Sequence, residues 1–161
     1  MPAGHIRKGD SMKDSICSVF GAHHRHCDDL LNATENLVHR GNWPRAETSL
    51  RAFVGAMLHH LDAEESTLFP AFEARTGQAW EPIRIMRMEH QQMRALIENM
   101  RQNIEVRDHQ HYLELSETLL TLLQQHNLKE EQVLYPLADR ALAGEISGLL
   151  QSMRANIAPE P

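Results

Sequence analysis

Apolar residues recur at steps of three and four along nearly the whole chain, the spacing that places them on one face of an α-helix. The alternation of apolar and polar residues that is typical of half-buried strands does not occur. Glycine, proline and polar clusters interrupt the helical pattern at a few points. The pattern therefore predicts an all-α protein with four long helices and a shorter C-terminal helix, over about residues 12–40, 43–75, 82–106, 110–141 and from 144 onward.

Short turns separate the predicted helices. We expect Ser11 to be the N-cap of the first helix, and "GNWP" at residues 41–44 supplies a glycine, an asparagine N-cap and a helix-start proline for the second. Gly77 closes the second helix, and "RDHQ" at residues 107–110 forms the turn before the fourth. Long helices joined by short turns favour an antiparallel up-down-up-down four-helix bundle.

The chain contains an internal repeat with an offset of 66 residues. The stretch "HLDAEESTLFP" at residues 60–70 returns as "HNLKEEQVLYP" at residues 126–136, and His24 likewise matches His90. Because each copy covers two predicted helices, we interpret the chain as two similar helical hairpins, each too small to bury its own core.

The turns place the repeated polar residues at one height in the bundle, because residues equidistant from the turn of an antiparallel hairpin lie side by side. The repeated histidines of the first hairpin are equidistant from residue 42, and those of the second from residue 108, both within predicted turns. Glu64 and His90 are equidistant from Gly77 in the same way. We therefore expect one layer of four histidines and two glutamates, which are His24, His60, Glu64, His90, His126 and Glu130.

These polar residues replace hydrophobic ones on the core-facing stripe of each helix. On the fourth long helix the stripe runs from His126 through Glu130 to Val133 and Leu137. A buried, unpaired carboxylate costs several kcal/mol, so the layer needs compensation. Either histidine–glutamate hydrogen bonds form a structural polar layer, or the layer binds cations. The duplication of the whole set with the same spacing favours a cation cluster.

Imidazole and carboxylate ligands without thiolate suit iron, manganese or zinc. Four histidines and two glutamates are too many for one tetrahedral zinc ion, whereas they fit two ions bridged by Glu64 and Glu130. Mixed nitrogen and oxygen ligands in a helical bundle favour two iron ions over manganese or zinc. A ferritin-like site is excluded, because it needs Glu-x-x-His and no histidine here has a glutamate three residues before it.

At these residues the chain resembles the hemerythrin HHE cation-binding family, whose pattern is a histidine followed by His-x-x-x-Glu, in two copies. The resemblance covers about residues 13–141. It implies a hemerythrin-like bundle around a non-haem, carboxylate-bridged di-iron centre. It further implies a protein that binds or reacts with O2, NO or peroxide, or supplies iron under oxidative or nitrosative stress. The alternative is a metal- or redox-dependent sensing module without turnover.

Two positions differ from those of the oxygen-carrying members of that family. Arg94 stands where the carriers have a fifth histidine, and Glu131 stands where they have an aspartate ligand. The resemblance therefore favours stress chemistry or sensing over oxygen transport. In this respect the ligand set is similar to that of the Repair of Iron Centres proteins.

Several neighbouring residues leave alternatives open. A register with His23 in place of His24 also gives an apolar stripe, although the repeat favours His24, and His23 or His26 remains a candidate auxiliary ligand. Glu65 and Glu131 are either outer partners of the histidines or solvated.

Aromatic residues and prolines follow both copies of the motif. Tyr135 aligns with Phe69, and we expect apolar packing of its ring; the alternative is that its hydroxyl reaches the layer. We expect Pro70 and Pro136 to kink their helices beside the layer.

Composition limits the partners. A formal net charge of -6 disfavours nucleic acid and anionic membranes. No apolar run approaches the ~20 residues of a membrane span and no signal-peptide pattern is present, so we expect a cytoplasmic protein. The expected partners are a small diatomic or peroxide ligand and an iron-accepting or signalling protein. We expect residues 1–10 to form a flexible tail and residues 11–161 a single domain.

Overall fold

A computed structural model describes residues 14–77 and 79–155 of the protein. Helices make up almost all of this part of the chain, and no strand occurs within it. The elements in chain order are α1 (Ile16–His39), α2 (Trp43–Ala63), η1 (Glu64–Leu68), α3 (Phe69–Thr76), α4 (Glu81–Glu105), α5 (His109–Lys129), η2 (Glu130–Leu134), α6 (Tyr135–Ala141) and α7 (Ile146–Ala155). The predicted all-α class is confirmed.

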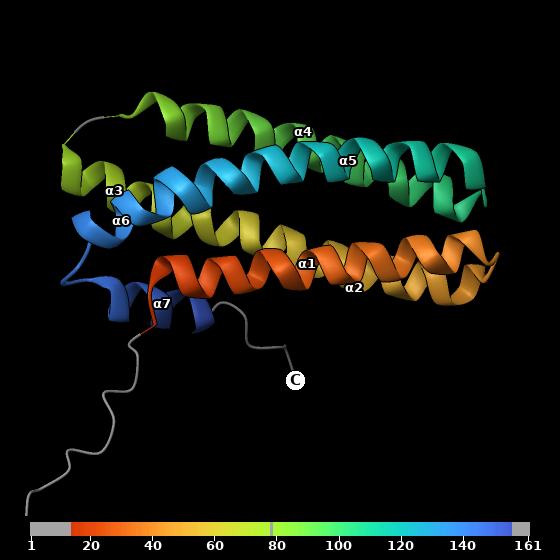
Figure 1. Ribbon diagram of the computed structural model, residues 1–161, viewed down its shortest axis with the longest axis horizontal. Helices are drawn as coiled ribbons and strands as arrows, with labels where there is room; N and C mark the ends of the chain where they lie inside the picture. The colour runs from red at the N-terminus through yellow and green to blue at the C-terminus, as the bar shows by residue number, and fades with distance from the viewer. Residues whose placement is uncertain (1–13, 78, 156–161) are drawn as a thin grey trace, which may run out of the picture.

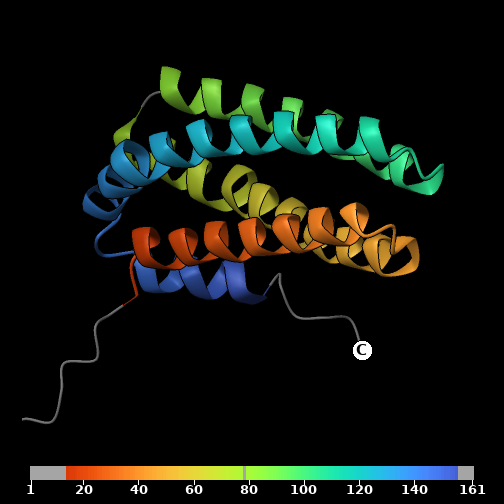
Figure 2. The ribbon, with the colours of Figure 1, turned by 45° about the vertical axis from the view of Figure 1, so that its right-hand side comes forward.

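Four long helical rods run side by side along the molecule (Figure 1). α1 and α2 form one hairpin and α4 and α5 the other, and the second rod of each hairpin continues into α3 or α6. Contacts of α1 with α5 and of α2 with α4 join the hairpins. The short helix α7 lies along the outside of α1 and contacts η1 (Figure 2). The predicted bundle with a short C-terminal helix is confirmed.

α1 begins at Ile16, later than the sequence pattern predicted. Ser15 is its N-cap, and the side chains of Ser15 and Ser18 each accept a hydrogen bond from the other residue's backbone N–H. The carboxylate of Asp139 accepts the N–H groups of Ile16 and Cys17 at 2.7 and 3.2 Å. A carboxylate at this position also complements the helix dipole. The predicted N-cap, Ser11, lies outside the described residues.

The other predicted turns are confirmed. Gly41 and Gly77 adopt positive φ angles of 69° and 77°, which is the left-handed conformation that glycine adopts without strain. Asn42 caps α2 by accepting the N–H of Arg45, and Asp108 caps α5 by accepting the N–H of His111. These turns fix the length of each hairpin, and so the height at which its side chains meet.

Each of the two prolines at which we expected a kink is preceded by a single π-helical turn, η1 before Pro70 and η2 before Pro136. The carbonyl of Glu64 accepts the N–H of Phe69, five residues on, and the carbonyl of Glu130 accepts the N–H of Tyr135. Proline cannot donate the next bond of a regular helix, and the wider turn accommodates its missing N–H.

Each π-helical turn adds one residue to the core-facing stripe. Val133, predicted on that stripe, is 50 % exposed, whereas Leu134 and Tyr135 are buried. In the first hairpin, Leu68 and Phe69 are buried in the same way. The inward register after each glutamate is therefore shifted by one position.

Two apolar clusters fill the bundle on either side of the histidine and glutamate layer. One lies towards the α1–α2 and α4–α5 turns and includes Leu31, Phe53, Met93 and Leu119. The other lies towards α3, α6 and α7 and includes Phe20, Phe69, Ile83 and Tyr135. The polar layer thus lies between two apolar blocks, where water does not compensate its charges.

Candidate metal centre

The structure brings all six predicted ligands into one buried layer. Each of the four rods contributes, and none of the six side chains is more than 3 % exposed. They are His24 from α1, His60 from α2, Glu64 from η1, His90 from α4, His126 from α5 and Glu130 from η2. The hairpin geometry inferred from the turns therefore holds in three dimensions.

The donor atoms face one another in two pairs. Nε2 of His24 lies 3.1 Å from Nε2 of His60, and Nε2 of His90 lies 3.3 Å from Nε2 of His126. Two nitrogens at ~2.1 Å from one ion and at a right angle to each other would lie about 3 Å apart. The two imidazole pairs are therefore spaced as neighbouring ligands of two ions.

The two glutamates connect these pairs. Oε1 of Glu64 lies 2.8 Å from Nε2 of His60, and its Oε2 lies 3.2 Å from Nε2 of His90. Oε1 of Glu130 lies 3.0 Å from Nε2 of His126 and 3.3 Å from Nε2 of His24. Two groups of four donors result, and both glutamates belong to both groups. Within each group the donor atoms all lie within 4.8 Å of one another.

The oxygens of the glutamates test whether the layer is a metal site or a hydrogen-bonded polar layer. Oε2 of Glu64 and both carboxylate oxygens of Glu130 are fully buried. Imidazole nitrogens face two of these three oxygens at 3.0–3.3 Å, but none of the three accepts a well-aligned hydrogen bond from a described residue. Buried carboxylate oxygens are almost always hydrogen-bonded, since leaving them unpaired is costly. A bound cation would compensate these oxygens, so the donor set fits a metal and not a self-sufficient polar layer.

Outer carboxylates orient three of the histidine rings. Nδ1 of His24 faces Glu131 at 3.1 Å, and Nδ1 of His90 faces Glu65 at 2.8 Å. This resolves the alternative left open by the sequence, because both glutamates contact the histidines. A carboxylate on Nδ1 fixes the tautomer and turns Nε2 towards the centre.

The third outer carboxylate is Glu89, which the sequence analysis missed. It lies 2.6 Å from Nδ1 of His126 and also pairs with Lys129. Glu89 belongs to α4 and His126 to α5, so the contact crosses between two helices. Because Glu89 has no counterpart in the first copy of the repeat, where position 23 is a histidine, the repeat carried no signal for it.

Tyr135 combines the expected apolar packing with the alternative contact of its hydroxyl with the layer. Its ring is buried in the apolar cluster, but its hydroxyl reaches the layer and donates to Oε1 of Glu64 at 2.5 Å. The same hydroxyl lies 3.1 Å from Nε2 of His24. The aligned Phe69 has no hydroxyl and stacks on His90. The two halves of the centre therefore differ in polarity.

Arg94, at the position of the carriers' fifth histidine, does not enter the layer. Its guanidinium binds Asp62 and Glu65 at 2.9 and 3.0 Å. Since Glu65 in turn faces His90, Arg94 holds an outer carboxylate in place. Arg94 therefore helps to orient a predicted ligand, His90, and does not take the place of a ligand itself.

The remaining histidines lie outside the two donor groups. His24 is buried at the layer whereas His23 is partly buried beside it, which supports the register that the repeat favoured. His26 is exposed and His59 is partly exposed. Burial and the neighbouring imidazoles lower the pKa of His23 to about 4.

The charges of the layer shift the pKa values of its members. Burial disfavours the charged form of His126, but the carboxylates of Glu130 and Glu89 outweigh burial and raise the pKa of His126 to about 10. The same balance raises the pKa of His24. Burial is likewise outweighed at Glu64, where the adjacent imidazoles hold the pKa of the carboxyl well below its usual range. A metal ion must therefore displace protons from histidines.

A helical bundle whose core places two four-donor histidine and glutamate groups around shared carboxylates defines a metal-binding helical protein. Comparison with family models identifies the family. The model of the hemerythrin HHE cation binding domain matches residues 16–138, and the chain belongs to this family. Comparison with curated proteins gives no significant match, and neither does comparison with solved structures. Among the described residues, no helix is both long and apolar enough to cross a membrane.

Proposed function

We propose that this protein is a non-haem di-iron protein that binds or reacts with a small molecule, O2, NO or peroxide. One observation carries the proposal, namely the two buried four-donor groups that share Glu64 and Glu130. The two buried carboxylates that the groups share carry negative charge, which favours cations at this layer.

The donor types favour iron. Both groups combine imidazole nitrogens with carboxylate oxygens, and neither contains a thiolate. Such sets suit iron, whereas soft thiolate ligands favour zinc and copper(I). Iron held in this way would change valence between ferrous and ferric and leave positions free for small ligands.

The protein's own residues orient and shield the centre. Glu131, Glu65 and Glu89 hold three of the four imidazoles with Nε2 towards the layer. The apolar clusters on both sides exclude bulk water, which strengthens every electrostatic interaction inside. The buried hydroxyl of Tyr135 is a hydrogen-bond donor at the layer, next to His24 and Glu64.

Anaerobic reconstitution tests the proposal. We expect the purified chain to bind about two ferrous ions, and its absorption and Mössbauer spectra to change on mixing with at least one of O2, NO and hydrogen peroxide. A stoichiometry well below two with iron in excess would contradict the dinuclear site. Two ions without any spectral change on mixing would contradict the proposed reactivity.

A histidine pair provides the matched control. The double variant His60→Ala, His126→Ala removes one imidazole from each donor group and should lose both ions. The double variant His39→Ala, His109→Ala removes two exposed, adjacent histidines at the far turns and should keep both. Equal iron binding by the two variants would show that the iron is bound elsewhere.

A further inference from the structure

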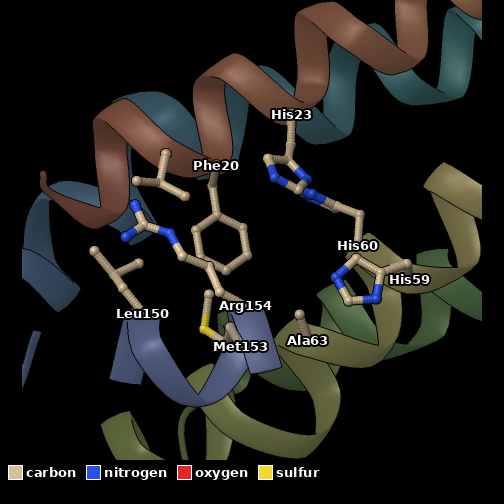
Figure 3. Close-up of a pocket in the computed structure, with 9 residues that line it drawn as sticks. Phe20, His23, His59, His60, Ala63, Leu150, Met153 and Arg154 are labelled. Carbon is tan, nitrogen blue, oxygen red and sulfur yellow. The ribbon is translucent and has the colours of Figure 1, made fainter. Parts of the chain in front are cut away.

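A small cavity lies against the His60 side of the centre (Figure 3). Its volume is about 40 Å³. One water molecule needs roughly 10–15 Å³ on this measure, so the cavity accommodates a molecule of two or three heavy atoms but no larger organic substrate. It is lined by Val19, Phe20, His23, His59, His60, Ala63, Leu150, Met153 and Arg154.

His60 differs from the other three histidines of the layer in a way that involves this cavity. Its Nδ1 is buried but has no hydrogen-bond partner among the described residues, whereas the other three Nδ1 atoms face carboxylates. Phe20 packs edge-on against the His60 ring, with a centroid separation of 5.2 Å. His23 faces the ring at 6.0 Å without a hydrogen bond. A wall of the cavity is therefore formed by a predicted ligand ring whose Nδ1 has no hydrogen-bond partner among the described residues.

The internal repeat shows how the surroundings of His60 differ from those of His126. His23 and Ala63 correspond to Glu89 and Lys129 in the second half. There, Glu89 binds Nδ1 of His126 and pairs with Lys129 across the surface. That ion pair closes the approach to His126, whereas a histidine and a small alanine leave the approach to His60 open.

Helix α7 completes the cavity. Leu150 and Met153 of α7 cover it from the side opposite His60 (Figure 3). α7 lies beyond the region that the repeat covers, and it packs beside α1 and η1 of the first hairpin. In the second half, Ile85, which corresponds to Val19, is 39 % exposed. The extra helix therefore gives an apolar roof to one half of the pseudo-symmetric bundle.

The partly exposed residues mark the mouth of the cavity. His23 and His59 are partly exposed, and the Arg154 side chain is 56 % exposed where it pairs with Asp14. A molecule entering between these residues would pass apolar side chains before it meets His60. An apolar interior of this size favours a small, uncharged ligand.

From this asymmetry we propose that the cavity is the entry and holding site for the small uncharged molecule that reaches the metal centre, which it approaches from the His60 side. The inference rests on the proposed function and deepens it, because it names the route and the half of the centre. It does not depend on any particular choice among O2, NO and hydrogen peroxide.

Xenon binding to the metal-free protein tests the holding site independently of reactivity. Small apolar cavities take up xenon, which 129Xe NMR detects. We expect xenon to bind in the cavity of the wild-type protein. It should not bind there in Val19→Trp, because the larger side chain fills the cavity. Ile85→Trp makes the same change at the repeat-equivalent surface position and should keep the site. Xenon binding that is equal in all three proteins would overturn the proposal.

Rates of reaction with NO test the route. We expect stopped-flow mixing of the iron-loaded protein with NO to show association slowed by about tenfold or more in Val19→Trp and Met153→Trp. Ile85→Trp should react at the wild-type rate. Iron content is measured first, so that each rate refers to a loaded centre. Unchanged rates in both filled variants would exclude this route, even though the centre reacts.

The most direct test introduces, beside His60, the two residue types that lie beside His126 in the second half. The double variant His23→Glu, Ala63→Lys reproduces the Glu89–Lys129 arrangement beside His60. It should retain iron and react slowly with NO, like the tryptophan variants; retained iron with a wild-type rate would count against the route. If the wild-type protein binds iron but does not respond to O2, NO or peroxide, the proposed function fails, while xenon still reports on the cavity.

Discussion

The hydroxyl of Tyr135 donates a hydrogen bond to Oε1 of Glu64, joining α6 to the shared carboxylate across the bundle. Tyr135 is fully buried, and burial together with the charges of Glu130 and Glu64 raises its pKa well above the usual value. In the metal-free protein the phenol is therefore protonated at neutral pH and acts as a donor. The corresponding position in the other half is Phe69, so this donor serves one half of the centre only.

Tyr135→Phe should destabilise the metal-free protein. The substitution removes the hydroxyl hydrogen bond to a buried carboxylate oxygen, which costs about 1–3 kcal/mol. Thermal unfolding of the apo protein measures the loss. Tyr112→Phe is the matched control, because the Tyr112 hydroxyl is buried without a partner among the described residues. An equal fall in Tm for both variants would contradict a specific role for the Tyr135 hydroxyl.

The shared glutamates should be needed for the metal far more than their neighbours. Glu64→Ala and Glu130→Ala each remove a donor common to both groups, so we expect iron content to fall from about two ions per chain to one or fewer. Glu65→Ala removes only an outer partner of His90 and should leave most of the iron bound at saturating concentration. Metal analysis after desalting distinguishes the variants. Equal losses in all three would refute the ligand register.

Glu89→Gln should weaken metal binding at the His126 side. The carboxylate raises the basicity of His126 and fixes its ring, and losing such a partner typically costs about 10–100-fold in metal affinity. Competition with a chelator measures the change. Glu98→Gln on the same helix removes an exposed carboxylate and should leave the affinity unaltered. A wild-type affinity for Glu89→Gln would mean that His126 does not depend on this contact.

The stability of the metal-free protein should fall as pH rises. Burial lowers the pKa of His126, but the adjacent carboxylates have the larger effect and raise the pKa to about 10. Folding therefore favours the protonated form of His126. This contribution is fully present below the unfolded pKa of about 6.5 and is lost as pH rises through the folded value. Denaturant unfolding of the apo protein between pH 6 and 10 measures it. His126→Gln should remove much of this slope, and a slope unchanged by that substitution would assign it to other groups.

Iron loading should release protons for the same reason. At neutral pH a pKa of about 10 means that His126 carries an extra proton that the metal must displace, and the raised pKa of His24 favours its protonated form as well. Isothermal titration calorimetry in buffers of different ionisation enthalpy counts these protons. We expect a net release of about one proton per chain at pH 7, and metal affinity should fall as pH is lowered. The absence of any proton release would contradict the protonation of His126 in the metal-free protein.

Turn positions and the internal repeat were sufficient to predict the fold and the six-residue layer. A helix has a fixed rise per residue and a fixed angular step, so turn positions and spacing suffice to bring His24, His60, His90 and His126 to one height. The doubling of the motif then supplied the reason to prefer a cation site over isolated polar residues. These inferences depend only on regular helices and short turns, and both occur where they were expected.

Features that depend on a local irregularity or on contacts between helices could not be predicted in this way. The π-helical turns shift the register by one residue, which exposes Val133 and turns Tyr135 towards Glu64. Glu89 reaches His126 only because α4 and α5 pack side by side, and no spacing within one helix encodes that contact. The cavity beside His60 likewise exists because α7 folds back onto the first hairpin. Repeat periodicity predicts what the two halves share, whereas packing decides where they differ.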